Sequence, residues 1–329
     1  MSFTIKGKDL FLPALIPSIS SFETQIRPES ALDLQAALSE PITLVSAYDL
    51  HMTPGLVEKV ALFRNDGRIV LMDSGGYENS RINRYSKDEN RWDFDKFKKC
   101  VLQCEVEFVA SFDYFMTDRQ GFSDFETDFV SHLQGHDFID RESLIPVIHL
   151  ESYNGEYVFS RDEILKICNR VASEFEPSFI AIPERELGAG MAQKISTLQA
   201  IADSFKVAGR ATKLHVLGCG NPLSFALLCD AGASMADGLE WCRTLVGEDF
   251  KLHHFQQAEL FDEPENKIYN PTVELIRNSG ADYKLKTLAR NLYALQQFNM
   301  EVGEMLSLGH LSDFVEDNFG LKAAQLIRR

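Results

Sequence analysis

The sequence predicts an α/β fold, a (β/α)8 TIM barrel with a C-terminal helical segment. Eight short apolar runs recur along the 329 residues, and stretches with helical spacing separate them. Short buried strands alternating with helices are typical of parallel βα units, and eight such units predict a closed barrel. The runs are Leu10–Ile16, Ile42–Val45, Ile69–Met72, Glu107–Ala110, Leu144–Ile148, Phe179–Ile182, Leu214–Leu217 and Ala233–Ala236.

The segments between the runs carry signals for helix starts. Thr53-Pro54 places a capping residue and a first-turn proline before an apolar stripe. Ser160 and Glu163 have the spacing of a capping box. Asn221-Pro222 opens a helix that we expect to end near Gly232. These signals place helices between consecutive strands, as a barrel requires.

After the eighth run the sequence changes character and becomes mostly helical from about Thr272. Its apolar residues fall on one helical stripe, formed by Leu285, Leu288, Leu292, Leu295 and Phe298. We therefore expect a barrel over residues 1–250 and a helical segment over residues 251–329 that packs on the barrel wall.

Composition narrows the class of protein. The net charge of −16 opposes non-specific binding to phosphate backbones. There is no apolar run of membrane-spanning length, and the first residues lack the apolar core of a signal peptide. The six cysteines form no Cys-x-x-Cys pair and no zinc spacing, which predicts buried thiols in a reducing compartment. We expect a cytoplasmic protein that makes no contact with a membrane.

Chemically active residues stand at the downstream edges of the runs. They are Asp73, Asp113, His149, Glu184, Gly218 and Asp237. Catalytic groups of TIM barrels gather at the C-terminal ends of the strands, and packing alone does not explain carboxylates there. Two aspartates on different strands can act as nucleophile and general acid/base in the cleavage of a glycosidic bond.

Two glycine-containing turns follow predicted strands. In Asp73–Glu78 the glycines allow a sharp turn and the approach of a flat ligand, which Tyr77 can stack on. A simple turn with a capping aspartate is the alternative interpretation. Leu217–Pro222 contains Gly-x-Gly but lacks the third glycine of a dinucleotide fingerprint, so it favours a close backbone approach to some other ligand.

Taken in order, these segments resemble the tRNA-guanine transglycosylase (queuine tRNA-ribosyltransferase) superfamily. Asp73–Glu78 resembles its Asp-Ser-Gly-Gly-Phe/Tyr-Gln hallmark, and Leu217–Pro222 resembles its Met-Gly-Val-Gly-Thr-Pro segment. Gly232–Arg243, GASMADGLEWCR, is similar to GVDMFDCVLPTR. Ala47–Gly55 and Phe112-Asp113 resemble two further family segments. The resemblance covers most of the barrel.

The resemblance implies base exchange on a nucleoside. Asp237 would attack the anomeric carbon and hold the ribose covalently, and Asp73 would be the general acid/base. Tyr77 and Leu217 would sandwich the base, which is guanine or a 7-deazaguanine, and Asp113 would accept its hydrogen bonds. The remaining predicted binding residues are Ser74, Gly75, Gly76, His149, Gly218, Gly220 and Arg243. We expect no cofactor.

Three departures from the family pattern concern substrate recognition. Cys242 is the last cysteine, so the family's zinc site cannot form. His149 stands where the family has a glutamine that contacts the base oxygen, and Pro183–Gly188 replaces a glycine-rich loop. We therefore expect an acceptor other than standard tRNA, such as DNA, a nucleotide or an antiviral-operon partner. The family's dimers suggest a homodimer, although the missing zinc region removes part of the usual interface.

Two other functions stay open at this point. The same carboxylates could serve a nucleoside hydrolase-like glycosidase that uses water as the acceptor. Alternatively, the chain could be a non-catalytic protein that binds a 7-deazaguanine or acts as an accessory subunit. The presence of both aspartates favours an enzyme.

Overall fold

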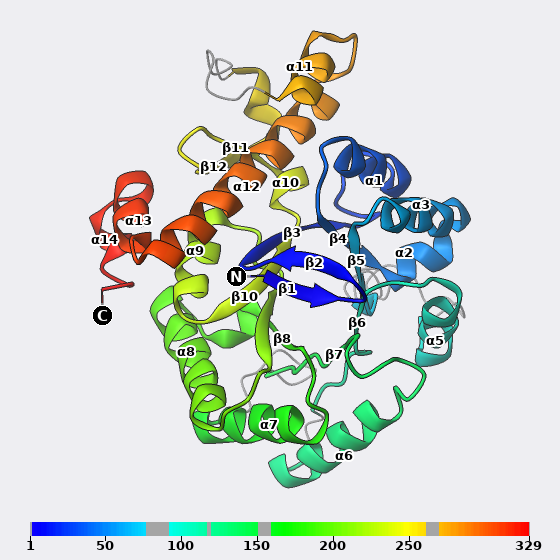
Figure 1. Cartoon of the computed structure of the whole chain (residues 1–329), viewed down its shortest axis with the longest axis vertical. Coiled ribbons are helices and arrows are strands. Elements are labelled where there is room, and N and C mark those ends of the chain that lie inside the picture. Colours follow the sequence, from blue (N-terminus) through cyan, green and yellow to red (C-terminus); the bar gives the residue numbers. More distant parts are fainter. Residues whose placement is uncertain (1, 77–91, 117–119, 151–158, 261–269, 329) are drawn as a thin grey trace.

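In the computed structural model, which describes residues 2–76, 92–116, 120–150, 159–260 and 270–328, an eight-stranded parallel sheet curls into a barrel (Figure 1). Its order is β7-β6-β5-β4-β3-β10-β9-β8. The edges meet where Val147 forms a parallel bridge with Ala181 and Ile148 N–H donates to the Ala181 carbonyl. The strands are β3 Ala14–Ile19, β4 Ile42–Ser46, β5 Ile69–Asp73, β6 Phe108–Ala110, β7 Leu144–Ile145, β8 Phe179–Pro183, β9 Lys213–Leu217 and β10 Ala233–Gly238. The predicted barrel is confirmed.

The first apolar run contributes to two strands rather than one. Its start belongs to β2 (Lys8–Phe11), which pairs antiparallel with β1 (Ser2–Ile5), and its end to the barrel strand β3. An unbroken apolar run does not show where a chain reverses direction, so the sequence did not reveal this hairpin. The hairpin lies across the middle of the barrel in Figure 1, and Phe3 contacts the rings of Phe108 and Phe179. It closes the N-terminal end of the barrel.

The barrel interior is a packed apolar core formed by alternate residues of each strand. Successive strand side chains point to opposite faces, so residues two apart share the interior. Ile42 and Leu44 of β4 follow this rule, as do Ile69 and Leu71 of β5. The other interior residues include Ala14, Ile16, Phe108, Ala110, Ile145, Val147, Phe179, Ala181 and Met235.

Helices surround the barrel, and the predicted starts of several are confirmed. The Ser160–Glu163 capping box is present at α7, and Asn221 Oδ1 accepts a hydrogen bond from Ser224 N–H at the start of α9. The elements are α1 Pro28–Ala37, α2 Ala47–Met52, α3 Pro54–Asn65, α5 Phe94–Gln103, α6 Phe122–Gln134, α7 Arg161–Glu174, the 3-10 helix η1 Glu184–Leu187, α8 Met191–Val207 and α9 Pro222–Asp230.

The C-terminal part packs on the barrel through one long helix, α12 (Tyr283–Leu308), which runs beside β3 and α9 (Figure 1). Its predicted apolar stripe is largely buried, and Asn299 Oδ1 accepts a hydrogen bond from Leu15 N–H of β3. The predicted boundary at residue 250 falls in the turn of a short hairpin. The elements are α10 Glu240–Arg243, β11 Thr244–Val246, β12 Leu252–His254, η2 Phe255–Leu260, α11 Pro271–Asn278, α13 Leu311–Phe319 and α14 Leu321–Ala324.

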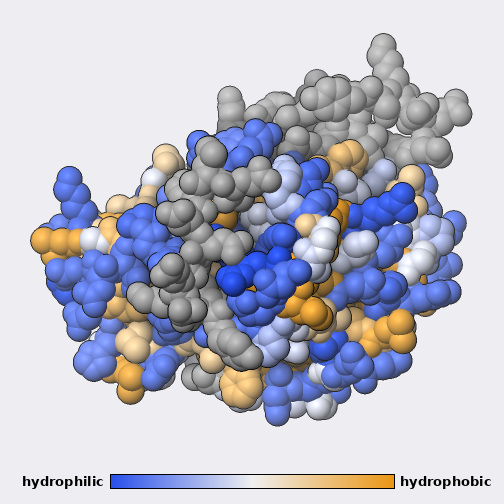
Figure 2. Space-filling view, turned by 90° about the horizontal axis from the view of Figure 1, so that it is seen from above, coloured by the Kyte–Doolittle hydropathy of each residue, from blue (hydrophilic) through white to orange (hydrophobic). Residues whose placement is uncertain are grey.

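The face of the molecule drawn in Figure 2 is mainly polar where its residues are described. On the face shown in Figure 2, hydrophobic residues are scattered among hydrophilic ones. Among the described helices, none has both the length and the apolar composition needed to cross a bilayer. All six cysteines are free and buried, as predicted, and burial raises the pKa of the Cys100 and Cys104 thiols to about 11.

Candidate active site

Polar side chains occupy the last interior positions of several strands, at the C-terminal end of the barrel. The same two-residue alternation that builds the core places them there. Asp73 follows the core residue Leu71 by two positions, and Asp237 follows Met235 in the same way. The barrel mouth therefore carries the side chains that the sequence placed at strand ends, and the hairpin covers the opposite end.

Asp237 is held by three hydrogen-bond donors from three different parts of the barrel. Ser18 Oγ donates to Oδ2 at 2.9 Å, and Gly218 N–H donates to Oδ1 at 3.3 Å. His215 Nε2 lies 3.0 Å from Oδ1. The Asp237 side chain is 10% exposed. These contacts fix the carboxylate in one orientation at the rim, which is the requirement for a nucleophile.

His215 and Ser18 are site residues that sequence reasoning missed. His215 lies inside β9 and is fully buried, and its Nδ1 has no hydrogen-bond partner among the described residues. Ser18 is buried on β3, two positions after the core residue Ile16. A histidine within an otherwise apolar strand was the available signal, because burying an imidazole is unfavourable without a polar partner.

The Asp73 turn is shaped by packing around its glycines. Gly75 N–H donates to Asp73 Oδ2 at 3.2 Å, and Gly75 has φ +84°, which favours glycine. A β-carbon at Gly75 would crowd Tyr48 and Trp92, and Trp92 Nε1 donates to the Ser74 carbonyl at 2.8 Å. Tyr77, predicted to stack on the base, lies outside the described residues, and so does Glu78, which stands at the position of the hallmark's final glutamine.

Asp113, His149 and Glu186 form a connected network beside this turn. Ser74 Oγ donates to Asp113 Oδ1 at 3.1 Å, and His149 Nε2 lies 3.4 Å from the same oxygen. His149 Nδ1 lies 3.0 Å from Glu186 Oε1, and the His149 ring packs on Phe115 at a centroid distance of 4.0 Å. Gly76 leaves the space that the Asp113 carboxylate occupies.

The network holds a buried cation between two carboxylates. Burial disfavours the His149 imidazolium, but the nearby carboxylates of Asp113 and Glu186, the latter within hydrogen-bond distance of Nδ1, outweigh burial and raise the pKa of His149 to about 9. Glu186 is fully buried in η1 and also accepts a hydrogen bond from Leu150 N–H at 2.7 Å. Both ring nitrogens of His149 therefore face carboxylates.

The two glycines after β9 differ in what surrounds them. Gly218 has φ +71°, and among the described residues nothing lies within 4 Å of the place a β-carbon would take. This position leaves room for a ligand. At Gly220 that space is taken by the Glu240 carboxylate, whose Oε2 is buried without a hydrogen-bond partner in the described part of the chain. Burial raises the pKa of Glu240.

The remaining two predicted residues occupy different surroundings. Leu217 ends β9, is partly buried and packs on the interior core, so it lies at the mouth. Arg243 lies on α10 with a half-exposed side chain, and its Nε is 3.6 Å from Glu23 Oε2. Leu217 thus lies beside the Asp237 cluster, whereas the contact that the structure gives Arg243 is with Glu23.

The arrangement places two sets of acidic groups at one mouth. One set contains Asp237 on β10, and the other contains Asp73, the last residue of β5, and Asp113, which follows β6. Two strands, β4 and β3, separate β5 from β10 in the barrel order, so the sets enter the mouth from different sides. Within the described residues, no group of His, Cys, Asp or Glu side chains is arranged to hold a metal ion.

No protein-family model matches this chain, and no curated protein matches it. The fold and the placement of the strand-end residues therefore stand on the structure, and the likeness to transglycosylases stays a prediction from the motifs.

Proposed function

We propose that the chain is a transglycosylase-like pentosyltransferase that exchanges a guanine-type base for a 7-deazaguanine through a covalent intermediate on Asp237. One observation carries the proposal. Asp237 is fixed at the barrel mouth by Ser18, His215 and Gly218, and among the described residues it contacts no lysine or arginine. An oriented carboxylate without a neutralising cation suits attack on an oxocarbenium-like centre.

The exchange divides into two displacements. In the first, an Asp237 oxygen forms a bond to the ribose anomeric carbon while the bond from that carbon to the base nitrogen breaks, and Asp73 protonates the leaving base. In the second, Asp73 takes a proton from the incoming base, whose nitrogen attacks the anomeric carbon and releases Asp237. Splitting the reaction lowers each barrier relative to direct displacement.

Recognition of the base falls to Asp113 and the surroundings of Gly218. The Asp113 carboxylate would accept hydrogen bonds from the exocyclic amine and ring N–H of a guanine-like base. The two ring nitrogens of His149 face Asp113 and Glu186, so His149 would hold the Asp113 carboxylate in one orientation and partly neutralise its charge. The open space beside Gly218 would admit the edge of the flat ring.

The acceptor that receives the new base is also proposed on the basis of charge. The net charge of −16 disfavours broad contact with a polyanion, which supports a nucleotide or a short nucleic-acid segment over a long duplex. DNA, tRNA, free nucleotides and an antiviral-operon protein are therefore separate arms of the first experiment.

That experiment follows labelled guanine and labelled 7-deazaguanines into separated pools of RNA, DNA, nucleotides and protein. Wild-type chain, Asp237→Asn, Asp73→Asn and the exposed control Asp203→Asn are compared. Label that enters one pool with wild type and Asp203→Asn, but not with the other variants, supports the proposal and names the acceptor.

Two results would replace the proposal. Release of free base without incorporation of a new one would assign a hydrolase. Tight binding of a deazaguanine without label in any pool would assign an accessory or binding role.

The role of His149 has its own test. His149→Gln restores the family's residue, so we expect the preference between guanine and 7-deazaguanines to change more than the maximal turnover. Competition between two labelled bases measures this directly. An unchanged preference would remove His149 from base selection.

A further inference from the structure

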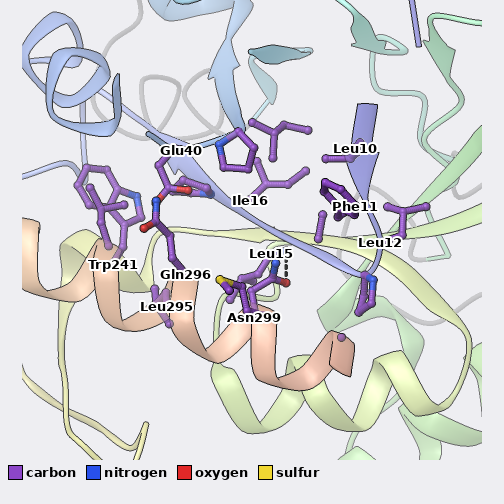
Figure 3. Close-up of a pocket in the computed structure, with 18 of the residues that line it drawn as sticks. Leu10, Phe11, Leu12, Leu15, Ile16, Glu40, Trp241, Leu295, Gln296 and Asn299 are labelled. Atoms are coloured by element: carbon purple, nitrogen blue, oxygen red, sulfur yellow. Dashed lines mark hydrogen bonds between the residues drawn. The ribbon is translucent and has the colours of Figure 1, made fainter. Parts of the chain in front are cut away.

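A groove runs along the outer wall of the barrel, between β3 and α12 (Figure 3). Its volume of about 700 Å³ lies within the range of small-molecule pockets. The walls are mainly apolar, and they include Leu10, Leu12, Leu15, Ile16, Leu292 and Leu295. The groove follows the outer side of β3, and its lining also includes Gly220, Gly238 and Glu240 near the mouth. The proposal made for the groove does not depend on the proposed transglycosylase function.

Asn299 and Gly303 of α12 lie close to the β3 wall beside the groove. Asn299 Oδ1 accepts the Leu15 N–H hydrogen bond at 3.0 Å, and Gly303 of α12 approaches Pro13 without a side chain between them. Large apolar side chains normally fill the space between a barrel and its helices. Here the space beside Asn299 and Gly303 is left open as the groove.

All the charged residues that line the groove are acidic. They are Glu40, Glu240 and Glu304, and the lining in the described structure includes no lysine, arginine or histidine. Glu40 is 4% exposed and lies beside Gln296 and Trp241 on one side of the groove (Figure 3). Burial raises the pKa of Glu40 to about 8, although the Gln296 hydrogen bond lowers it. A buried carboxyl without a cation is a costly feature that a cationic ligand would relieve.

Exposed apolar side chains also border the groove. Phe11 on β2 is 75% exposed and Met300 on α12 is 66% exposed, and both line the groove. They stand on opposite walls, so one apolar ligand could cover both. Covering such side chains is favourable by about 25 cal/mol per Å² of apolar area.

We propose that this groove binds an elongated apolar amine, with its ammonium group at Glu40 and its hydrocarbon body along β3 and α12 toward Phe11 and Met300. Charge complementarity selects a cation over an anion. The apolar walls select a hydrocarbon body over a polyamine or a sugar, because buried polar groups would find few partners there.

The test compares decylamine, decanol and decanoate, which share one chain and differ in the head group. Isothermal titration at pH 8 and 0.15 M salt should show one molecule of decylamine per chain, with a dissociation constant on the order of 10 µM. Decanol and decanoate should bind at least about tenfold more weakly, since neither supplies a cation to Glu40.

Variants locate the ligand. Glu40→Gln should weaken decylamine about tenfold and leave decanol unchanged, whereas Glu301→Gln, on α12 but outside the groove, should change neither. Phe11→Ala and Met300→Ala are exposed positions that tolerate truncation, and each should weaken decylamine about threefold. Equal binding of decanol, preference for decanoate, or wild-type affinity in Glu40→Gln would each overturn the proposal.

Discussion

The two ends of the barrel each hold a buried carboxylate, and the two are paired differently. Near the N-terminal end, Glu107 accepts hydrogen bonds from Lys8 Nζ, Arg64 Nε and Val70 N–H, each at 2.9 Å. At the C-terminal mouth, Asp237 faces a hydroxyl, an imidazole and a backbone N–H. Two cations neutralise Glu107, whereas no lysine or arginine contacts Asp237 in the described structure.

This difference separates a structural carboxylate from a chemical one. A fully paired buried acid stabilises the fold through its partners, and its oxygen lone pairs are already occupied by hydrogen bonds, so they are not available to a substrate. An oriented acid without a cation keeps its charge available and accepts a higher electrostatic cost for doing so. The comparison predicts that substitutions at the two ends damage different properties.

The largest effect is expected at Asp237. Asp237→Asn keeps the shape and most hydrogen bonds but removes the nucleophile, so base exchange should fall on the order of 10⁴-fold. The free energy of unfolding should change by about 1 kcal/mol or less. Exchange assays and urea unfolding of the same preparation measure both. Loss of stability that parallels the loss of activity would place Asp237 in the structural class instead.

The opposite pattern is expected at Glu107. Glu107→Ala leaves Lys8 and Arg64 without their shared carboxylate, so the free energy of unfolding should fall by about 3–5 kcal/mol. Glu105→Ala is the matched control, because Glu105 pairs with the same Arg64 but its side chain is 77% exposed, and its cost should be far smaller than that of Glu107→Ala. Urea unfolding of both variants measures the contrast, and equal costs would contradict it.

A smaller effect is expected at His215, which contacts the nucleophile without reaching the substrate. His215→Phe removes the contact to Asp237, so kcat should fall about 100-fold while KM changes little. His215→Gln keeps a donor in reach and should recover part of the loss. A positioning role predicts this rescue, and equal defects in the two variants would indicate that His215 only fills space.

The smallest of these expected effects concerns His149, whose imidazolium lies between two carboxylates at the mouth. Its pKa is raised above the ordinary value to about 9, so its contribution to stability is fully present below pH 6.5 and is lost as the pH rises through about 9. Wild-type stability should fall on the order of 2 kcal/mol more than that of His149→Gln between pH 6.5 and 9.5. Urea unfolding across this range tests it, and parallel curves would show that the network does not stabilise the imidazolium.

Local patterns in the sequence were sufficient for the barrel. Strand periodicity, helix starts at Ser160 and Asn221, and the apolar stripe of α12 depend on residues close in the chain, and each is found as expected. The strand-end positions of Asp73 and Asp237 follow from the same alternation, because a strand that packs its last interior leucine or methionine presents the residue two further on at the mouth.

Tertiary structure alone decided which residues meet. Ser18 lies 219 positions before Asp237 in the chain, yet Ser18 and His215 both contact the Asp237 carboxylate. Tertiary structure likewise brought Glu186 to His149, placed the β1–β2 hairpin over the far end of the barrel and formed the groove beside α12. Side-chain periodicity fixes the direction in which a residue points, but its partners depend on strand order and closure, which the sequence encodes only through the energy of the whole fold.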